Sequence, residues 1–541
     1  MSENQNQRRV KTEQSRKEGR FCRIIMAFFY AFLNCVRYYI DLLIDAAFGY
    51  YYDPTRQCIP KVKNKIILDS ATTLATKIRK GELKSEEVVE AFIDRIKEVN
   101  GIINAVVDDR FEEALQEARK IDKDIETGNI IDADFQAKPF LGVPFTAKES
   151  TSVKGMSNTM GLKIRQGKKA KYDADIVENV KKSGAICIGV TNIPQMNYWQ
   201  ETGNPLFGIT KNPYNTTRNV GGSSGGEASN LAACGTAISI GSDIGGSIRI
   251  PSFMCGVFGH KPTTGLISTK GLSFRDGKET QTMVTAGVMS RHAEDLAPLL
   301  KVLLGTNAAK LKLDTPVDLS SLRVLFVVDP QDPFVSPFRQ EIKDSIWKIV
   351  SFMRDECNEP PTAVNFKQFR YTTKLWRFWM GREETDFKSD LTDQNGKIAV
   401  IPAILKHFLF MSSDYSTGTV YNLISDLFPK VDETWAKEET EDLKKALTDK
   451  LGDKGVLIFP SAPFTASYHH TALLRPYNFN LFSIFNVLKF PVTQVPLGLD
   501  SQGLPLGVQV VSAPHNDHLT IAVAKALEKQ FGGYVPPFSA S

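Results

Sequence analysis

Two glycine-rich stretches decide the fold and the chemistry of this chain: Asn219-Val-Gly-Gly-Ser-Ser-Gly-Gly-Glu227 and Gly241-Ser-Asp-Ile-Gly-Gly-Ser-Ile-Arg249. The segment between them, Ala228 to Ile240, is small, apolar and free of proline, and it predicts a helix. Glycine allows positive φ angles and lets backbone N–H groups approach a ligand closely. Serine hydroxyls beside exposed N–H groups suit acyl transfer, which needs a nucleophile and donors for an oxyanion.

Two known glycine-rich motifs require flanking residues that this stretch does not have. A Gly/Ser cluster is often a flexible loop. A phosphate-binding loop requires Gly-Lys-Ser/Thr at its end, but here Glu227 follows the last glycine and would repel phosphate. Gly221-Gly-Ser223-Ser-Gly225 fits the G-x-S-x-G nucleophile elbow. That elbow follows a hydrophobic strand, whereas residues 214–219 are polar and turn-like, so the sequence favours a flexible loop or an acyl-transfer loop.

An upstream lysine offers a base for such a serine. Leu141 to Glu149 contains a short apolar strand that ends at Lys148. Burial disfavours the charged form of lysine and can lower its pKa by about 3–5 units. A neutral lysine can accept a proton from a serine. The sequence leaves a second interpretation equally open, in which Lys148 forms an ion pair with Glu149.

Lys148 and the two loops together resemble the amidase signature family, and within it the fatty-acid amide hydrolases of the second, vertebrate type. The similarity runs from about Ser70 to Gly533. Further matching pieces are Phe258-Gly-His-Lys-Pro262, Ala293-Glu-Asp-Leu-Ala-Pro298, Phe490-Pro-Val-Thr-Gln494 and Gly503-Leu-Pro-Leu-Gly-Val-Gln509. Each piece alone is weak evidence, but their combination is highly specific.

The resemblance implies a role for each matching residue. Ser247 would be the nucleophile, Ser223 the bridging serine and Lys148 the base. The backbone amides that would form the oxyanion hole are those of Ile244, Gly245, Gly246 and Ser247. The supporting polar residues would be Ser224, Asp243 and Arg249. The resemblance implies neither a cofactor nor a metal.

The resemblance also implies a substrate class. It implies a membrane-attached serine amidase that cleaves long-chain fatty-acid amides, such as N-acylethanolamines or primary amides like oleamide. The membrane would be that of the endoplasmic reticulum or of a lipid droplet. The sequence does not decide which face of the membrane the protein lies on, or whether the protein forms a homodimer. Two alternatives remain: the glutamine-hydrolysing subunit of a tRNA amidotransferase, and a catalytically silent lipid-binding protein of the same fold.

The N-terminal segment indicates contact with a membrane. Residues 1–20 are polar and basic, and we expect them to be disordered. Ile24 to Val36 is an apolar run of 13 residues, shorter than the ~20 that span a bilayer. The charged residues that follow this run share one stripe of a helix with Asn34, and the apolar residues share the opposite side. The stripe contains Asn34, Arg37, Asp41 and Asp45, and the apolar side contains Phe28, Phe29, Phe32, Val36, Ile40 and Leu43.

Several structures of this segment are compatible with the pattern. It could be an interfacial anchor, a tilted transmembrane helix, as the resemblance implies, a core helix or a signal peptide. We therefore divide the chain into a basic tail (1–20), a membrane-associating or transmembrane helix (21–50), a connector (51–65) and a catalytic domain (66–541).

The rest of the chain predicts one large α/β domain, with a mixed and largely parallel twisted sheet covered by helices on both sides. Predicted helices start at Ser85 and cover 110–125 and 173–183, and predicted strands cover 186–190, 322–328, 456–459 and 508–511. Lys374–Met380 and Ile401–Met411 are rich in apolar residues, typical of core helices or of walls of an acyl-chain channel.

Composition narrows the classes of partner. A net charge of +5 is small for 541 residues and argues against nucleic acid. Seven cysteines without a CxxC motif fit neither a disulfide framework nor a zinc site. His469, His470, His515 and His518 lack companions at ligand spacing, so we predict no metal.

Overall fold

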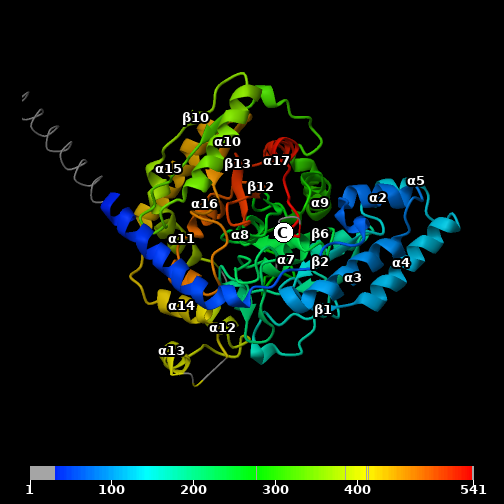
Figure 1. Ribbon diagram of the computed structural model, residues 1–541, viewed down its shortest axis with the longest axis horizontal. Coiled ribbons are helices and arrows are strands. Elements are labelled where there is room, and N and C mark those ends of the chain that lie inside the picture. The colour runs from blue at the N-terminus through cyan, green and yellow to red at the C-terminus, as the bar shows by residue number, and fades with distance from the viewer. Residues whose placement is uncertain (1–30, 276, 384–385, 410, 412–413, 539–541) are drawn as a thin grey trace, which may run out of the picture.

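The centre of the molecule is an eleven-stranded sheet (Figure 1). The computed structural model describes residues 31–275, 277–383, 386–409, 411 and 414–538. In spatial order the strands are β1 (Val106–Asp109), β3 (Ile186–Thr191), β2 (Pro144–Lys148), β6 (Ile238–Asp243), β8 (Thr285–Ser290), β7 (Phe258–Lys261), β12 (Val492–Leu499), β13 (Pro505–Ser512), β11 (Gly455–Pro460), β9 (Arg323–Phe326) and β10 (Thr362–Ala363).

The sheet is mixed, as predicted, but the prediction that it is largely parallel is wrong. The parallel pairs are β2–β3, β2–β6, β9–β11 and β9–β10. The other six pairs of neighbouring described strands are antiparallel. Strands near the middle follow one another without a crossover helix: β12 and β13, for example, are joined by the turn at residues 500–504. Such short connections favour antiparallel pairing.

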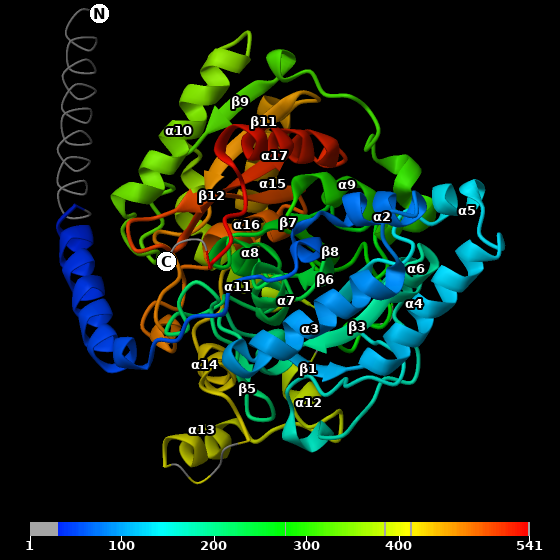
Figure 2. The same cartoon turned by 45° about the vertical axis from the view of Figure 1, so that its right-hand side comes forward.

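Helices cover both faces of the sheet (Figures 1 and 2). The side chains of β11 show the division: Val456 and Ile458 belong to one hydrophobic cluster, and Leu457 and Phe459 to another. Alternate residues of a strand point to opposite faces, so each face has its own core. Beyond the N-terminal helix, the described helices are α2 (Ala71–Arg79), α3 (Ser85–Ile103), α4 (Phe111–Glu126), α5 (Asp132–Ala137), α6 (Asp175–Lys182), α7 (Gly225–Ala232), α8 (Arg249–Met254), α9 (Leu296–Leu304), α10 (Gln340–Glu356), α11 (Thr372–Met380), α12 (Phe387–Asp390), α13 (Val400–Phe408), α14 (Thr417–Ser425), α15 (Glu433–Leu451), α16 (Asn480–Val487) and α17 (Asp517–Phe531).

Most of the predicted elements are present within a few residues. The helices predicted at Ser85, 110–125 and 173–183 are α3, α4 and α6, and the four predicted strands are β3, β9, β11 and β13. The single helix predicted for Ala228 to Ile240 is wrong, because α7 ends at Ala232 and β6 begins at Ile238. Cys234 there has a φ of 63°, which ends the helix and turns the chain into the sheet.

The N-terminal helix is described for residues 31–52 and lies along the surface of the molecule (Figure 2). The predicted basic tail and the first part of the apolar run, from Ile24 to Tyr30, lie outside the described residues. Within the described part of the chain, no helix combines the length and the hydropathy needed to cross a bilayer.

The two apolar segments of the middle region differ from each other. Lys374–Met380 falls within α11, whose Leu375 and Phe378 are buried in the core. Ile401–Met411 falls mostly within α13, where Ala403 is the one described residue of the helix that is buried. The interpretation of this second segment as a core helix is therefore wrong.

Candidate active site

The two glycine-rich loops meet beside the ends of two neighbouring parallel strands. Lys148 is the last residue of β2, and Asp243 is the last residue of β6. The first loop leads into α7, and the second leads from β6 into α8. The amide of Ser224 donates to the carbonyl of Ser247 over 3.0 Å, which joins the loops directly. The sheet thus places Lys148, Ser223 and Ser247 in one buried region.

Lys148 contacts serine hydroxyls and not its neighbour in the sequence. Its Nζ donates to Ser223 Oγ over 2.6 Å and to Ser242 Oγ over 3.2 Å. Glu149 accepts hydrogen bonds from Thr159, through both its amide and its hydroxyl, and from the amide of Met160. The alternative of a Lys148–Glu149 ion pair is therefore wrong.

Burial of Lys148 changes its protonation. Loss of water around the amine lowers its pKa to about 7, although the carboxylates of Asp243 and Glu227 act in the opposite direction. A lysine with this pKa is neutral in a large fraction of molecules at neutral pH. The amine beside Ser223 is therefore available as a proton acceptor.

Glu227 is a buried carboxyl close to this lysine. It accepts hydrogen bonds from Thr146 Oγ1 over 2.5 Å and from Thr191 Oγ1 over 2.8 Å. Burial raises its pKa to about 7, against the opposing effect of these hydroxyls and of Lys148. Glu227 therefore ties the start of α7 to strands β2 and β3.

Asp243 organises the second loop. Its carboxylate accepts from the amides of Gly246 (2.8 Å) and Ile248 (3.1 Å) and forms an ion pair with Arg249 (3.1 Å). Burial alone would favour the neutral acid, but the charge of Arg249 outweighs it and holds the pKa of Asp243 far below its usual value. The remaining donors of Arg249 bind Phe482 O, Asn486 Oδ1 and Gln509 Oε1. This network fixes the backbone on both sides of Ser247.

The four amides expected to bind an oxyanion are not equivalent. The Gly246 amide is engaged by Asp243. Those of Ile244, Gly245 and Ser247 have no hydrogen-bond acceptor within the described part of the chain. Ser247 Oγ likewise has no hydrogen-bond partner there, and Ser224 Oγ is buried without one. Among the described residues, Lys148 is thus hydrogen-bonded to Ser223, but Ser223 is not hydrogen-bonded to Ser247.

Two features of the site have no signal in the sequence. Ser242 lies next to Asp243 in β6, yet only the pairing of β6 with β2 brings its hydroxyl to Lys148. Trp376 comes from α11, more than a hundred residues away. A Cβ at Gly245 would lie 2.8 Å from the Trp376 ring, so the indole packs directly on the second loop. The chain therefore supplies an apolar wall beside Ser247.

Comparison with known proteins agrees with this geometry. The profile of the family described as Amidase matches residues 87–521. The chain is 40% identical over 490 residues to Fatty-acid amide hydrolase 2-B of Danio rerio, covering 88% of this chain and 92% of that protein. It is 40% identical over 486 residues to Fatty-acid amide hydrolase 2 of Homo sapiens, covering 88% and 91%.

Its fold is also that of a solved structure entitled Fatty acid amide hydrolase. The TM-score is 0.69 at 22% identity, and the match covers 91% of this chain and 89% of that one. The long matches to the two hydrolases above, together with the family profile, fix the classification. The chain belongs to the amidase signature family and is a hydrolase related to fatty-acid amide hydrolase 2.

Proposed function

We propose that this protein is a membrane-attached serine amidase that hydrolyses long-chain fatty-acid amides to a fatty acid and an amine. The observation that carries the proposal is the buried Lys148 amine, with its pKa lowered to about 7, at 2.6 Å from Ser223 Oγ. An amine in this state can drive a relay through two serines. The names of the 40% identical relatives supply the substrate class.

The relay accounts for each proton. Neutral Lys148 accepts the proton of Ser223 as Ser223 accepts that of Ser247, and Ser247 Oγ attacks the carbonyl carbon. The oxyanion that forms lies against free amides of the second loop, and each such donor contributes roughly 3–4 kcal/mol in related chemistry. The proton then returns through Ser223 to the departing nitrogen, which must be protonated to leave. Water cleaves the acyl-enzyme through the same residues.

The surroundings of Ser247 favour a lipid acyl chain. Trp376 packs on Gly245, and Phe482 lies against Gly246. At the surface, α13 exposes Ile401, Leu405 and Phe408, which is typical of a binding surface for an apolar partner. We propose a membrane of the endoplasmic reticulum or of a lipid droplet as that partner.

The test is hydrolysis of oleamide by the purified full-length chain. We expect Ser247→Ala to abolish both hydrolysis and labelling by a fluorophosphonate probe, since the attacking oxygen is gone. Ser223→Ala should slow hydrolysis while the protein stays folded. Labelling of the Ser247→Ala protein would refute the nucleophile assignment.

A series of amides with increasing acyl-chain length separates the substrate classes. We expect kcat/KM to rise with chain length, because the added methylenes bind apolar side chains. Each buried methylene contributes about 0.8 kcal/mol, or roughly fourfold. Glutaminase activity that exceeds oleamide hydrolysis would instead favour an amidotransferase subunit.

A further inference from the structure

The N-terminal helix turns its polar stripe toward the protein. Asp41 is buried, and Arg475 Nε donates to its Oδ1 over 2.8 Å. Arg475 also donates to Asp45 over 2.7 Å, and its side chain is only 3% exposed. Two carboxylates of one stripe thus share a single buried guanidinium that lies far along the chain.

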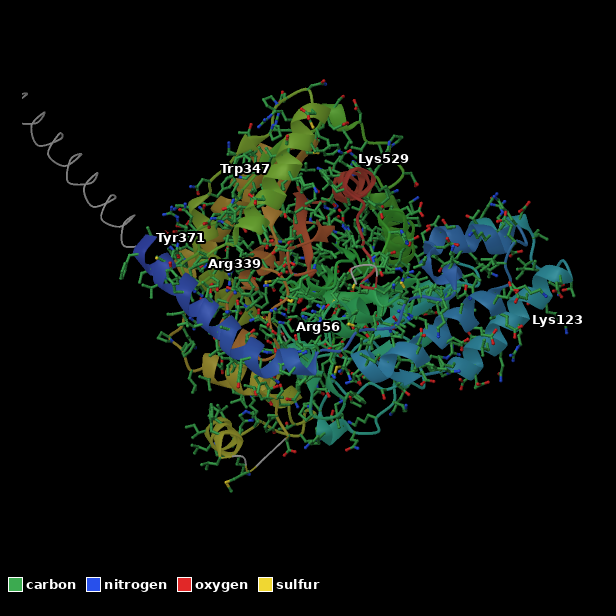
Figure 3. All side chains as sticks on the ribbon, in the orientation of Figure 1. Arg56, Lys123, Arg339, Trp347, Tyr371 and Lys529 are labelled. Atoms are coloured by element: carbon green, nitrogen blue, oxygen red, sulfur yellow. The ribbon has the colours of Figure 1, made fainter. Side chains whose placement is uncertain are left out.

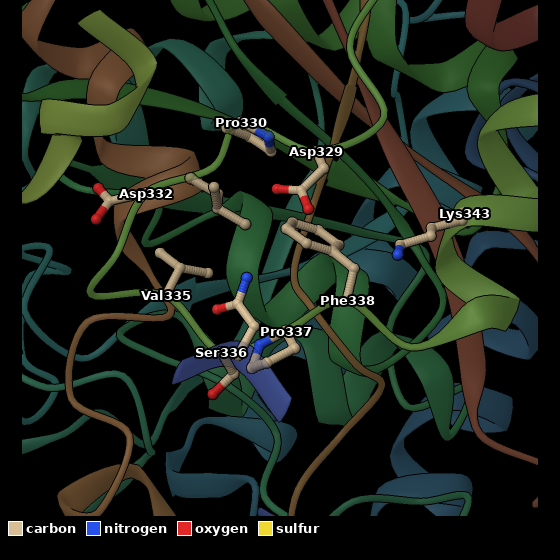
Figure 4. Close-up of a pocket in the computed structure, with 10 residues that line it drawn as sticks. Asp329, Pro330, Asp332, Val335, Ser336, Pro337, Phe338 and Lys343 are labelled. Atoms are coloured by element: carbon tan, nitrogen blue, oxygen red, sulfur yellow. The ribbon is translucent and has the colours of Figure 1, made fainter. Parts of the chain in front are cut away.

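Other contacts of the stripe agree with this orientation. Arg339 Nη2 donates to Asp45 Oδ2 over 3.0 Å, and Figure 3 labels Arg339 beside the helix. Arg37 donates to the carbonyls of Pro333 (3.0 Å) and Phe334 (2.7 Å). Next to this contact, Asn34 lines a pocket of about 140 Å³. Figure 4 labels the lining residues that come from the neighbouring segment, Asp329, Pro330, Asp332, Val335, Ser336, Pro337 and Phe338. The polar stripe therefore meets the catalytic domain along much of its length.

The apolar side of the same helix faces away from the protein. Phe32 is 64% exposed and Leu43 is 70% exposed. The other exposed apolar and aromatic side chains of the helix are Leu33, Val36, Tyr38, Tyr39, Ile40, Tyr50 and Tyr51. A surface helix of a globular protein normally has the reverse arrangement, with its apolar side on the core. The outward side of the helix is thus as apolar as a side that packs on a protein core, yet it is exposed to solvent.

We propose that this helix lies flat in the surface of a lipid bilayer, held in that rotation by Arg475 and Arg339. The inference rests on the membrane attachment proposed above and specifies its geometry. If the helix crossed the bilayer, Arg37, Asp41 and Asp45 would lose their partners and enter the lipid, which is strongly unfavourable. A flat helix keeps these contacts and buries its apolar side at the headgroup boundary.

Two further features fit a lipid surface as the occupant. The exposed tyrosines of the helix are a residue type enriched at the membrane–water boundary. The chain before the helix carries Arg8, Arg9, Lys11, Arg16, Lys17 and Arg20, which suit the phosphates of anionic lipids. In Figures 1 and 2 the helix and α13 lie toward the same side of the molecule.

The first test is binding of the full-length chain to phosphatidylcholine vesicles that contain phosphatidylserine. We expect the double variant Ile40→Glu, Leu43→Glu to bind about a hundredfold more weakly, because two outward side chains no longer enter the lipid. The matched control is Ile131→Glu, an equally exposed residue beside α5, which should bind as the wild type does. Wild-type binding by the double variant would overturn the proposal.

The second test separates a flat helix from a spanning one in vesicle-bound protein. Asp45→Asn and Arg339→Gln should each lower Tm, and the double variant should lower it no further than the stronger single change. The same cycle with Asp41→Asn and Arg475→Gln should show a larger coupling energy, because that pair is more deeply buried. The side chains of Arg339 and Asp45 are 25% and 29% exposed, so the first cycle stays measurable if the Arg475→Gln protein does not fold. Additive effects in both cycles would reject the docked helix. Neither test measures catalysis, so failure to hydrolyse oleamide would count only against the proposed function.

Discussion

Two buried cations of the active site, Lys148 and Arg249, have opposite surroundings. Arg249 forms an ion pair with Asp243 and three further hydrogen bonds to uncharged acceptors. Lys148 is equally buried, yet within the described residues its hydrogen bonds go only to the hydroxyls of Ser223 and Ser242. The charge of Arg249 is thus neutralised by a carboxylate in direct contact, and that of Lys148 is not.

The difference lies in whether each buried basic side chain is paired with a carboxylate, and it bears on the base that we propose. A guanidinium keeps its proton at any ordinary pH, so its burial is tolerable only with a complete set of acceptors. An amine can release its proton instead, and burial without a carboxylate contact lowers the pKa of Lys148 to about 7. The two side chains are equally buried, so the difference between them comes from their hydrogen-bond partners: Arg249 is paired with a carboxylate and Lys148 is not.

The largest expected effect follows from removing the uncompensated cation. Lys148→Met should lower kcat/KM for oleamide by about 10²- to 10⁴-fold, because the proposed general base is lost. It should leave the free energy of unfolding near neutral pH unchanged or raise it by about 1–4 kcal/mol, because an apolar side chain replaces a desolvated amine. Chemical denaturation and steady-state kinetics on the same preparation measure both.

The pH dependence of that gain has a defined sign. The folded-state pKa of Lys148 is lowered from 10.5 to about 7. Between these values the unfolded chain binds the proton and the folded chain does not, so wild-type stability from this group rises with pH. The advantage of Lys148→Met should therefore be greatest near pH 7 and shrink toward pH 10. An advantage that grows over this window would contradict the lowered pKa.

Removing the compensated cation should have a different outcome. Arg249→Met leaves the buried Asp243 carboxylate without its ion pair, and we expect the free energy of unfolding to fall by about 3–5 kcal/mol. The double variant Asp243→Asn, Arg249→Met should recover part of this loss. The control Arg323→Met, at an exposed position of β9, should change stability by less than about 0.5 kcal/mol.

The smallest effect concerns the charge near Lys148. The wild-type kcat/KM should rise with pH through about 7 and level off above it, because we propose the neutral amine of Lys148 as the active form. Glu227→Gln removes a carboxylate that raises the pKa of Lys148, so the rise should move to lower pH by less than about one unit. Glu201→Gln is the matched control, since Glu201 is also buried but binds the amides of His470 and Ala472. A shift of equal size in the control would remove Glu227 from this role.

Much of the site's placement was predictable from the sequence. Serine and glycine spacing pointed to both loops, and the apolar strand before Lys148 indicated a buried amine. The sequence did not decide between a free Lys148 and a Lys148–Glu149 ion pair, because β2 ends at Lys148 and Glu149 belongs to the turn that follows. That turn directs the Glu149 carboxylate toward Thr159.

Other features depend on contacts that no local pattern encodes. The helical period predicts that Arg37, Asp41 and Asp45 share one stripe, but it does not predict which side of the helix contacts the rest of the protein. That orientation comes from Arg475, hundreds of residues away in the chain. Similarly, residues 238–243 are as apolar as the helix before them, and pairing with β2 and β8 makes them a strand.

The Asp41–Arg475 contact has a consequence for biosynthesis. The two residues are 434 positions apart, so the ribosome finishes the N-terminal helix long before it makes the arginine that orients it. During that interval the apolar side of the helix is exposed on the nascent chain, and exposed apolar surface promotes aggregation at this stage. A lipid surface that receives the helix early would shelter it, and translation beside a membrane would then serve assembly as well as location.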